Sequence, residues 1–263
     1  MVAADSAALA CRDLAVAVPG RRLVDGLDLV LEPGDFLAVL GRNGTGKTLT
    51  LLTLAGLRVP QSGEVRLQGR TLAELKRSQI ARELALLPQS VDDAFPATVL
   101  ETVLVGRHPH VGPLGWETAG DRRIACRALD RVGLAPFADR DIATLSGGER
   151  RRAAIAQVLT QEPQVYLLDE PTNHLDPQHQ LEVLRLFAGK VRDGAAVIAT
   201  LHDVNLAARF AQRCLLLYGD GRWALGPTAS VLSESRLSEL YAVPMAAVPW
   251  RGRHVFMPDG PSL

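Results

Sequence analysis

The chain has 263 residues, of which 47% are hydrophobic and 22% are charged, and its 29 basic residues balance 29 acidic ones. These values are ordinary for a globular protein, and the length allows one domain with an inserted or appended subdomain. A net charge of zero excludes a general electrostatic attraction to nucleic acid or to an anionic membrane surface. Short basic runs at 76–77, 122–123 and 150–152 are interpreted as solvated faces of helices, not as a nucleic-acid patch.

The three cysteines, Cys11, Cys126 and Cys214, lie far apart and lack a CxxC spacing. This pattern argues against a disulfide framework and a zinc cluster, and it favours a reducing compartment. The first residues lack the basic region and apolar core of a secretory signal, and no segment approaches the roughly 20 apolar residues of a membrane span. We therefore expect any function at a membrane to be carried out from the cytoplasmic side, through partners.

Strand-like runs come first in chain order. They occupy residues 9–31, with turn signals at 25–26 and 33–34, and the same alternation returns at 64–67, which predicts a small antiparallel sheet. Continuous apolar runs of strand length occur at 36–40, 165–168 and 195–200. Strands buried on both faces have this composition, and helical stretches lie between them, so a parallel α/β core is predicted.

Helical patterns occupy the stretch between Ser90 and Ala143. Thr98 and Glu101 have capping-box spacing, and residues 121–132 form a second helix closed by Gly133. Residues 106–120, between these helices, contain two prolines and four glycines and are predicted to be a surface loop. Further on, we expect a hairpin turn at 218–222, a short helix near 236–241 and an irregular tail.

A glycine-rich motif follows the strand expected at 36–40 and precedes an apolar helix. Its eight residues fit GxxxxGK[ST]: Gly41, Arg42, Asn43, Gly44, Thr45, Gly46, Lys47 and Thr48. Glycines let the backbone curl around phosphate oxygens at the positive end of a helix. We expect Lys47 to reach the β- and γ-phosphates of ATP and the Thr48 hydroxyl to ligate Mg²⁺. A glycine turn without a ligand is the alternative.

Two carboxylates end the apolar run at 165–168. Asp169 is expected to hold Mg²⁺ through its water shell, and Glu170 is placed to polarise the attacking water. Buried strands often end in Asp, so this pair is weak alone. Together with the phosphate-binding motif, it predicts ATP hydrolysis.

The segment Leu145-Ser-Gly-Gly-Glu, 23 residues before Asp169, makes the sequence resemble the ATP-binding cassette (ABC) family. Ser146, Gly147, Gly148 and Glu149 precede or open a helix expected to run to about Gln161, so a hydroxyl, backbone N–H groups and the helix dipole could face a γ-phosphate. Plain capping of this helix would explain Ser146 but not the glycine pair.

The resemblance extends to other motifs and implies their roles. Gln89 matches the family's glutamine that touches Mg²⁺ or the water, and residues 173–176 match a loop at the dimer interface. His202 matches the switch histidine that contacts the γ-phosphate. The resemblance covers about residues 14–244 and implies a head-to-tail homodimer, in which each ATP lies between one subunit's phosphate loop and the other's signature.

The resemblance also implies one ABC ATPase domain over 1–263, with a helical subdomain at about 90–160 and a short C-terminal extension at about 218–263. The fold class implied for the chain is α/β: a P-loop core with a mainly parallel sheet, an N-terminal antiparallel β subdomain and a helical insertion. One position departs from the family pattern: Val18 stands where many members stack an aromatic side chain on adenine. Apolar contact, with Arg21 or Arg22 laid over the ring, would replace that stack.

Several segments resemble the ATPases of bacterial importers for ferric siderophores, haem and vitamin B12: residues 95–103, 106–110, 201–209 and 240–245. This implies a multi-span permease dimer as partner, indirectly a periplasmic binding protein, and a place on the cytoplasmic face of the inner membrane. The permease would dock near residues 89–98. An exporter ATPase is the alternative, and a soluble non-transport ABC protein ranks below it. His108 and His110 flank a proline without a carboxylate or cysteine nearby, and we interpret them as loop residues, not metal ligands.

Overall fold

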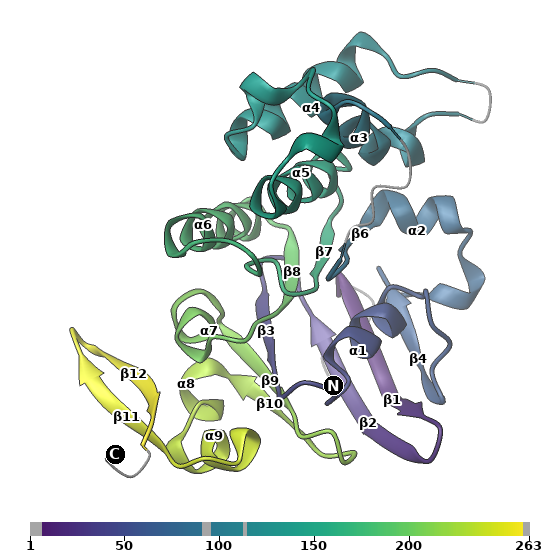
Figure 1. Cartoon of the computed structure of the whole chain (residues 1–263). Coiled ribbons are helices and arrows are strands. Elements are labelled where there is room, and N and C mark those ends of the chain that lie inside the picture. The colour runs from purple at the N-terminus through teal and green to yellow at the C-terminus, as the bar shows by residue number, and fades with distance from the viewer. Residues whose placement is uncertain (1–6, 91–95, 113–114, 260–263) are drawn as a thin grey trace.

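The computed structural model describes residues 7–90, 96–112 and 115–259. Its centre is a six-stranded sheet in the order β10-β9-β3-β8-β7-β6, in which all neighbours are parallel except β9 and β10 (Figure 1). Its strands are β3 (Phe36–Leu40), β6 (Leu84–Leu87), β7 (Val165–Leu168), β8 (Ala196–Thr200), β9 (Arg213–Leu217) and β10 (Trp223–Pro227). The predicted parallel core is confirmed.

Both faces of this sheet are covered by hydrophobic cores. Along β3, Phe36, Ala38 and Leu40 belong to one core, while Leu37 and Val39 belong to the other. This double burial explains why the strands read as continuous apolar runs rather than as alternating ones.

A second, four-stranded sheet has the order β2-β1-β4-β5 and is antiparallel. Its strands are β1 (Leu9–Val18), β2 (Arg21–Leu31), β4 (Ser62–Leu67) and β5 (Arg70–Thr71). The antiparallel sheet is therefore confirmed, but the turn expected at Asp25-Gly26 is wrong. The chain reverses at Pro19-Gly20, and β2 continues through Gly26, whose positive φ of 61° accommodates an irregular register with β1.

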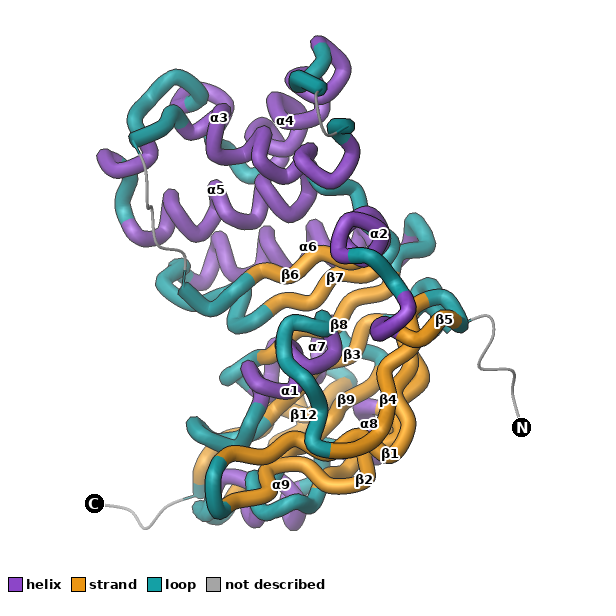
Figure 2. Tube along the Cα trace, turned by 90° about the vertical axis from the view of Figure 1, so that its right-hand side faces the viewer, coloured by secondary structure: helices purple, strands orange, loops and turns teal. Residues whose placement is uncertain are grey.

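The helices are distributed over both cores. They are α1 (Lys47–Leu54), α2 (Arg77–Glu83), α3 (Val99–Leu104), α4 (Ala119–Arg131), α5 (Gly147–Thr160), α6 (Pro177–Arg192), α7 (Val204–Phe210), α8 (Thr228–Val231) and α9 (Glu234–Tyr241). Helix α1 lies in the core between the two sheets. Helices α3, α4 and α5 pack on one another at one end of the molecule (Figures 1 and 2). None of the described helices is long and apolar enough to cross a membrane.

Residues 106–120 do not form the continuous surface loop that the sequence predicts. Residues Val105–His110 form a 3₁₀ helix, in which Gly106 and Arg107 are buried. Arg107 pairs with Asp121 at 2.8 Å and with Glu162 at 3.1 Å. The glycine serves close packing here, because a Cβ at Gly106 would lie 2.3 Å from the Gln157 carbonyl oxygen on α5.

The packing of Gly106 predicts a large stability difference between two glycines of this segment. In Gly106→Ala the added methyl overlaps the α5 backbone, so we expect the free energy of unfolding to fall by about 1–3 kcal/mol. Gly112→Ala is the matched control, since no atom lies within 4 Å of its added Cβ, and we expect a change within about 0.5 kcal/mol. Urea unfolding of both variants measures this, and equal midpoints would contradict the packing argument.

The C-terminal residues are more regular than expected. The hairpin at 218–222 and the helix near 236–241 are confirmed, but the irregular tail is wrong: β11 (Met245–Trp250) and β12 (Arg253–Pro258) form an antiparallel hairpin. Its turn residues, Arg251 and Gly252, both have positive φ. This is the backbone of a two-residue turn whose twist matches the paired strands.

Candidate functional site

The glycine-rich loop leads from β3 directly into α1. Gly44 and Gly46 have φ of +78° and +100°, and a Cβ at Gly41 would lie 2.5 Å from the Thr45 hydroxyl. A left-handed, closely packed backbone of this kind requires glycine. The N-cap residue of α1, Gly46, provides no side-chain hydrogen bond. The first N–H groups of this helix are therefore left for an anionic ligand.

Lys47 is held against this loop. Its Nζ donates to the carbonyl oxygens of Gly41 at 2.8 Å and Arg42 at 3.2 Å. Burial lowers the pKa of Lys47, and the negative charges of Glu170 and Asp169 partly oppose that shift. A phosphate group would supply a stronger acceptor than the two carbonyls. Thr48 lies half-buried in the first turn of α1.

The two carboxylates lie just beyond the end of β7, and both are buried. The Thr200 hydroxyl donates to Asp169 Oδ1 at 2.7 Å and accepts from the Glu170 N–H at 2.7 Å. Glu170 has a φ of +50°, a left-handed conformation that is uncommon outside glycine and typical of functional positions. The Asp169 Oδ2 atom forms no hydrogen bond with any described residue.

The three residues predicted to be catalytic meet at one carboxylate. His202 Nε2 lies 2.6 Å from Glu170 Oε1, and the Gln89 amide donates to Glu170 Oε2 at 2.9 Å. The Asn173 amide also donates to Oε2. Gln89 and His202, from two segments distant in the sequence, thus converge with the nearby Asn173 on Glu170, which can act as a proton acceptor once a water replaces one of these partners.

The sequence prediction missed Arg151. The run 150–152 was expected on a solvated face, but Arg151 is only 5% exposed, and its guanidinium reaches the backbone of two catalytic segments. It donates to the Pro88 carbonyl oxygen at 2.5 Å, and to those of Asp169 and Glu170 at 2.5 and 2.8 Å. Burial lowers its pKa to about 10, so it remains cationic at neutral pH.

One sequence signal could have identified Arg151 as buried. On α5, Arg151 stands four, seven and eight positions before Ile155, Val158 and Leu159, all of which are buried. This is the spacing of one helix face. An arginine on an apolar face must have partners, and here they are backbone carbonyls.

The signature residues cap α5 within this chain. Ser146 Oγ accepts from the Glu149 N–H at 3.3 Å, and Glu149 accepts from the Ser146 N–H at 2.8 Å. The hydrogen bonds from Ser146 lower the pKa of Glu149. Ser146 and Gly147 are exposed. Among the described residues, no hydrogen bond joins the signature to the phosphate loop, so one chain does not bring the two motifs together.

Val18 lies half-buried at the end of β1, opposite Arg21. The sequence prediction placed Arg21 or Arg22 over an adenine ring, but the structure engages both elsewhere. Arg21 Nε donates to the Gly219 carbonyl oxygen at 2.9 Å, and Arg22 pairs with Asp25 at 2.9 Å. Gly219 in turn packs on the phosphate loop, since a Cβ there would lie 2.9 Å from Thr45 Cα.

The absence of an aromatic side chain at Val18 predicts weak base selectivity. Apolar contact with Val18 distinguishes adenine from guanine less than a specific ring stack with hydrogen bonds would. We therefore expect ATP and GTP to be hydrolysed with kcat/KM values within about tenfold of each other. Steady-state assays with both nucleotides test this. A Val18→Tyr variant should strengthen nucleotide binding, and a strong ATP preference in the unchanged protein would contradict the prediction.

The donor set fits Mg²⁺ and ATP. The Thr48 hydroxyl, the Gln89 side-chain amide and the Asp169 carboxylate all offer oxygen ligands, the type that Mg²⁺ prefers. Asp169 Oδ2, which has no partner among the described residues, could bind the cation. The uncapped N-terminus of α1 could bind the phosphate anion beside it.

The loop, the carboxylate pair and the signature define a class of nucleotide-hydrolysing protein. A family model described as ABC transporter matches residues 24–173. The chain belongs to the ATPase subunits of the ABC transporter family.

Individual relatives add detail. The chain is 41% identical over 236 residues to the hemin import ATP-binding protein HmuV of Streptomyces coelicolor, covering 90% of this chain and 84% of that protein. It superposes with a TM-score of 0.84 on an inward-facing metal-chelate type ABC transporter, at 29% identity and with 97% of this chain and 98% of that chain covered. It also resembles a bacterial ABC transporter cassette solved as a dimer, with a TM-score of 0.72, 25% identity and coverage of 82% and 97%.

Proposed function

We propose that the chain is the ATP-hydrolysing subunit of a bacterial importer for haem or a related iron chelate. The observation that carries hydrolysis is the convergence of His202, Gln89 and Asn173 on Glu170. The import direction and substrate class are supported by the likeness to a hemin import ATP-binding protein and to a metal-chelate type transporter. Ferric siderophores and vitamin B12 remain within this class, and export is the alternative.

In the proposed mechanism Glu170 accepts the proton of the attacking water. Glu170 has a left-handed backbone, and its N–H donates to the Thr200 hydroxyl, which fixes the backbone from which the buried carboxylate extends. His202, from the end of β8, would contact the γ-phosphate, and Lys47 would exchange its two carbonyl acceptors for phosphate oxygens. Bound Mg²⁺ would neutralise phosphate charge, held by Thr48, Asp169 and Gln89.

Gln89 occupies a position that links nucleotide binding to the proton acceptor. Its amide now donates to the same Glu170 oxygen as Asn173 does. If Gln89 held a bound Mg²⁺ through its amide oxygen instead, one acceptor position on Glu170 would become free for water. The carboxylate would therefore become a competent base only in the loaded site.

We propose a head-to-tail homodimer for the active form. Ser146 and Gly147 are exposed at the start of α5 and do not bond to the phosphate loop of their own chain within the described ranges. A second copy would bring its signature to that loop, and the dimeric cassette among the similar structures supports this arrangement. Binding of ATP would close the dimer and hydrolysis would release it.

The permease partner would hold the dimer on the cytoplasmic face of the inner membrane. We place its docking site beside Ala97, just before α3. Ala97 is half-buried, and its carbonyl oxygen accepts from the Ile142 N–H at 2.9 Å. Residues 91–95 of the sequence-predicted docking stretch lie outside the described residues. A periplasmic binding protein would act only through the permease.

Reconstitution tests this proposal. The subunit and its co-purifying membrane protein are placed in vesicles with ATP on the subunit's side, and uptake of hemin, a ferric siderophore and vitamin B12 is measured. We expect ATP-dependent movement of hemin or another iron chelate toward the ATP side. Movement away from that side would establish an exporter, and co-purification with no membrane protein would contradict a transport role.

A further inference from the structure

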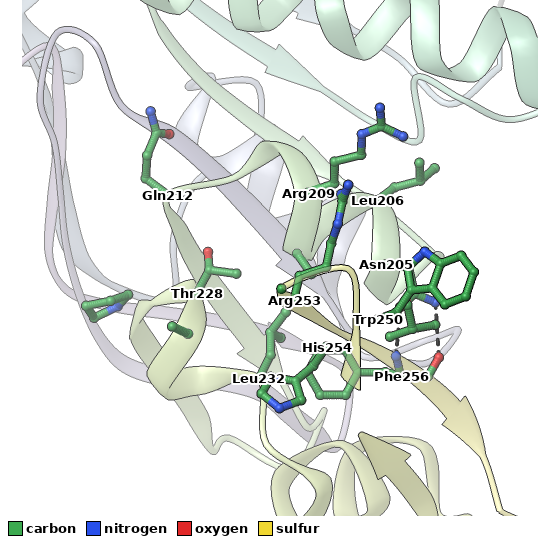
Figure 3. Close-up of a pocket in the computed structure, with 15 residues that line it drawn as sticks. Asn205, Leu206, Arg209, Gln212, Thr228, Leu232, Trp250, Arg253, His254 and Phe256 are labelled. Carbon is green, nitrogen blue, oxygen red and sulfur yellow. Dashed lines mark hydrogen bonds between the residues drawn. The ribbon is translucent and has the colours of Figure 1, made fainter. Parts of the chain in front are cut away.

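A cavity with an unassigned role lies outside the ATP site. It has a volume of about 770 Å³ and is formed by α7, by the start of α8 and by the β11–β12 hairpin (Figure 3). It shares no described lining residue with the phosphate loop, the carboxylate pair or the signature. Pockets of this size hold small organic ligands.

The wall of this cavity is fixed by hydrogen bonds. The Asn205 amide donates to the Phe256 carbonyl oxygen at 3.0 Å, and its side-chain oxygen accepts from the Phe256 N–H at 2.8 Å, so β12 is fastened to α7 (Figure 3). At the base of the hairpin, the Ala247 N–H donates to Glu234 at 2.7 Å. The cavity is therefore formed before any ligand arrives, which reduces the entropic cost of binding.

The neutral polar groups of the wall are already bonded within the protein. Besides Asn205, the Gln212 side-chain oxygen accepts from the Phe36 N–H at 2.8 Å, and the Thr228 hydroxyl donates to the Ala211 carbonyl oxygen at 2.7 Å. These groups help to build the site.

The basic groups of the wall have no such partners. Arg209, Arg253 and His254 line the cavity, and its described lining includes no Asp or Glu. Neither arginine side chain forms an ion pair or a hydrogen bond with a described residue, whereas the nearby Arg213 pairs with Asp35 at 3.0 Å. In Figure 3 the Arg253 side chain extends toward Arg209. Two guanidinium groups without a counterion on one wall favour an anion with planar oxygens, such as a carboxylate.

An aromatic surface lies beside these charges. Trp250 pairs with Arg253 across the hairpin and is 56% exposed, an unusual exposure for so large an apolar side chain. In Figure 3 its indole lies beside Asn205 and Phe256. The Arg251 guanidinium lies 5.2 Å from the centroid of the Trp250 ring. A flat ring stacked on the remaining apolar surface would cover it, whereas a small inorganic anion would leave it in water.

We propose that this cavity is a binding site for a planar organic anion, with an aromatic body on Trp250 and an acidic group between Arg209 and Arg253. The ligand would bridge α7 and the C-terminal hairpin. The site does not depend on the transport role proposed above.

The test uses two matched fluorescent probes on the full-length protein in excess Mg-ADP, which occupies the nucleotide site. 8-Anilinonaphthalene-1-sulfonate joins a flat naphthalene ring to an anionic sulfonate, and N-phenyl-1-naphthylamine is the same molecule without the sulfonate. We expect saturable binding of one equivalent of the sulfonate, and affinity for the uncharged probe at least about tenfold weaker. Equal affinity for the two probes, or displacement of the sulfonate by inorganic phosphate at a similar concentration, overturns the proposal.

Variants locate the probe. The double variant Arg209→Ala/Arg253→Ala should weaken sulfonate binding by about tenfold or more and leave the uncharged probe unaffected, and Trp250→Ala should weaken both. Arg185→Ala is the control, because Arg185 is exposed on α6 and lies outside the described lining. If the double variant folds poorly, the single variant Arg253→Glu, which changes only the exposed hairpin, replaces it and should also weaken sulfonate binding. Sulfonate binding within twofold of the unchanged protein in the Arg253→Glu variant, or an equal loss in Arg185→Ala, overturns the proposal.

Discussion

The variant Glu170→Gln is expected to lose ATP turnover while keeping nucleotide binding. Glutamine has the size of glutamate and can still bond to Gln89, Asn173 and His202, but it cannot accept the proton of the attacking water. General-base catalysis contributes roughly 10²- to 10⁴-fold, so kcat should fall by that factor. Phosphate release and fluorescent-nucleotide binding measure the two quantities separately.

The same variant should also accumulate the ATP-bound dimer. In the proposed dimer hydrolysis releases the two subunits, so blocking it should leave ATP between each phosphate loop and the opposite signature. Size-exclusion chromatography with ATP should show a dimer for Glu170→Gln and mostly monomer for the unchanged protein. Glu117→Gln, at an exposed position, is the control and should behave like the unchanged protein. Near-normal hydrolysis by Glu170→Gln would remove Glu170 from the role of base.

The parts of the site predicted from sequence are those whose chemistry is local. The phosphate loop requires glycines at fixed spacings, and its left-handed residues Gly44 and Gly46 occur where the motif places them. The capping boxes at Thr98 and Ser146 likewise involve groups only three residues apart. The strands were predicted because burial on both faces imposes an apolar composition over a short window.

The features that were missed depend on contacts between distant segments. The glycines and prolines of residues 106–120 predict a loop. Gly106, however, packs against the Gln157 carbonyl oxygen on α5, which lies 51 residues later in the sequence. The β11–β12 hairpin is held by Asn205, which stands 51 residues before its partner Phe256. The signature was predicted from sequence, but its predicted ATP contact involves a second chain. One subunit therefore shows only the helix cap formed by Ser146.

Arg151 joins the signature helix to the catalytic carboxylate, and its replacement should lower turnover more than nucleotide affinity. From α5 it bonds to the carbonyl oxygens of Pro88, next to Gln89, and of Asp169 and Glu170. Without the guanidinium these backbone segments can shift relative to each other, and a displacement of about 1 Å at a catalytic group costs up to roughly 10²-fold in rate. The phosphate loop has no bond to Arg151 among the described residues, so the KM for ATP should change little.

We expect Arg151→Met to reduce kcat by about 10- to 10²-fold and to lower the free energy of unfolding by about 3 kcal/mol or more, since several buried carbonyls lose their donor. Arg151→Lys keeps the charge and part of the bonding and should recover part of the rate. Arg122→Ala, on the exposed face of α4, is the matched control. The rates are measured well below the melting temperature of each variant. If Arg151→Met then retains normal kcat and only melts earlier, Arg151 supports the fold without positioning Glu170.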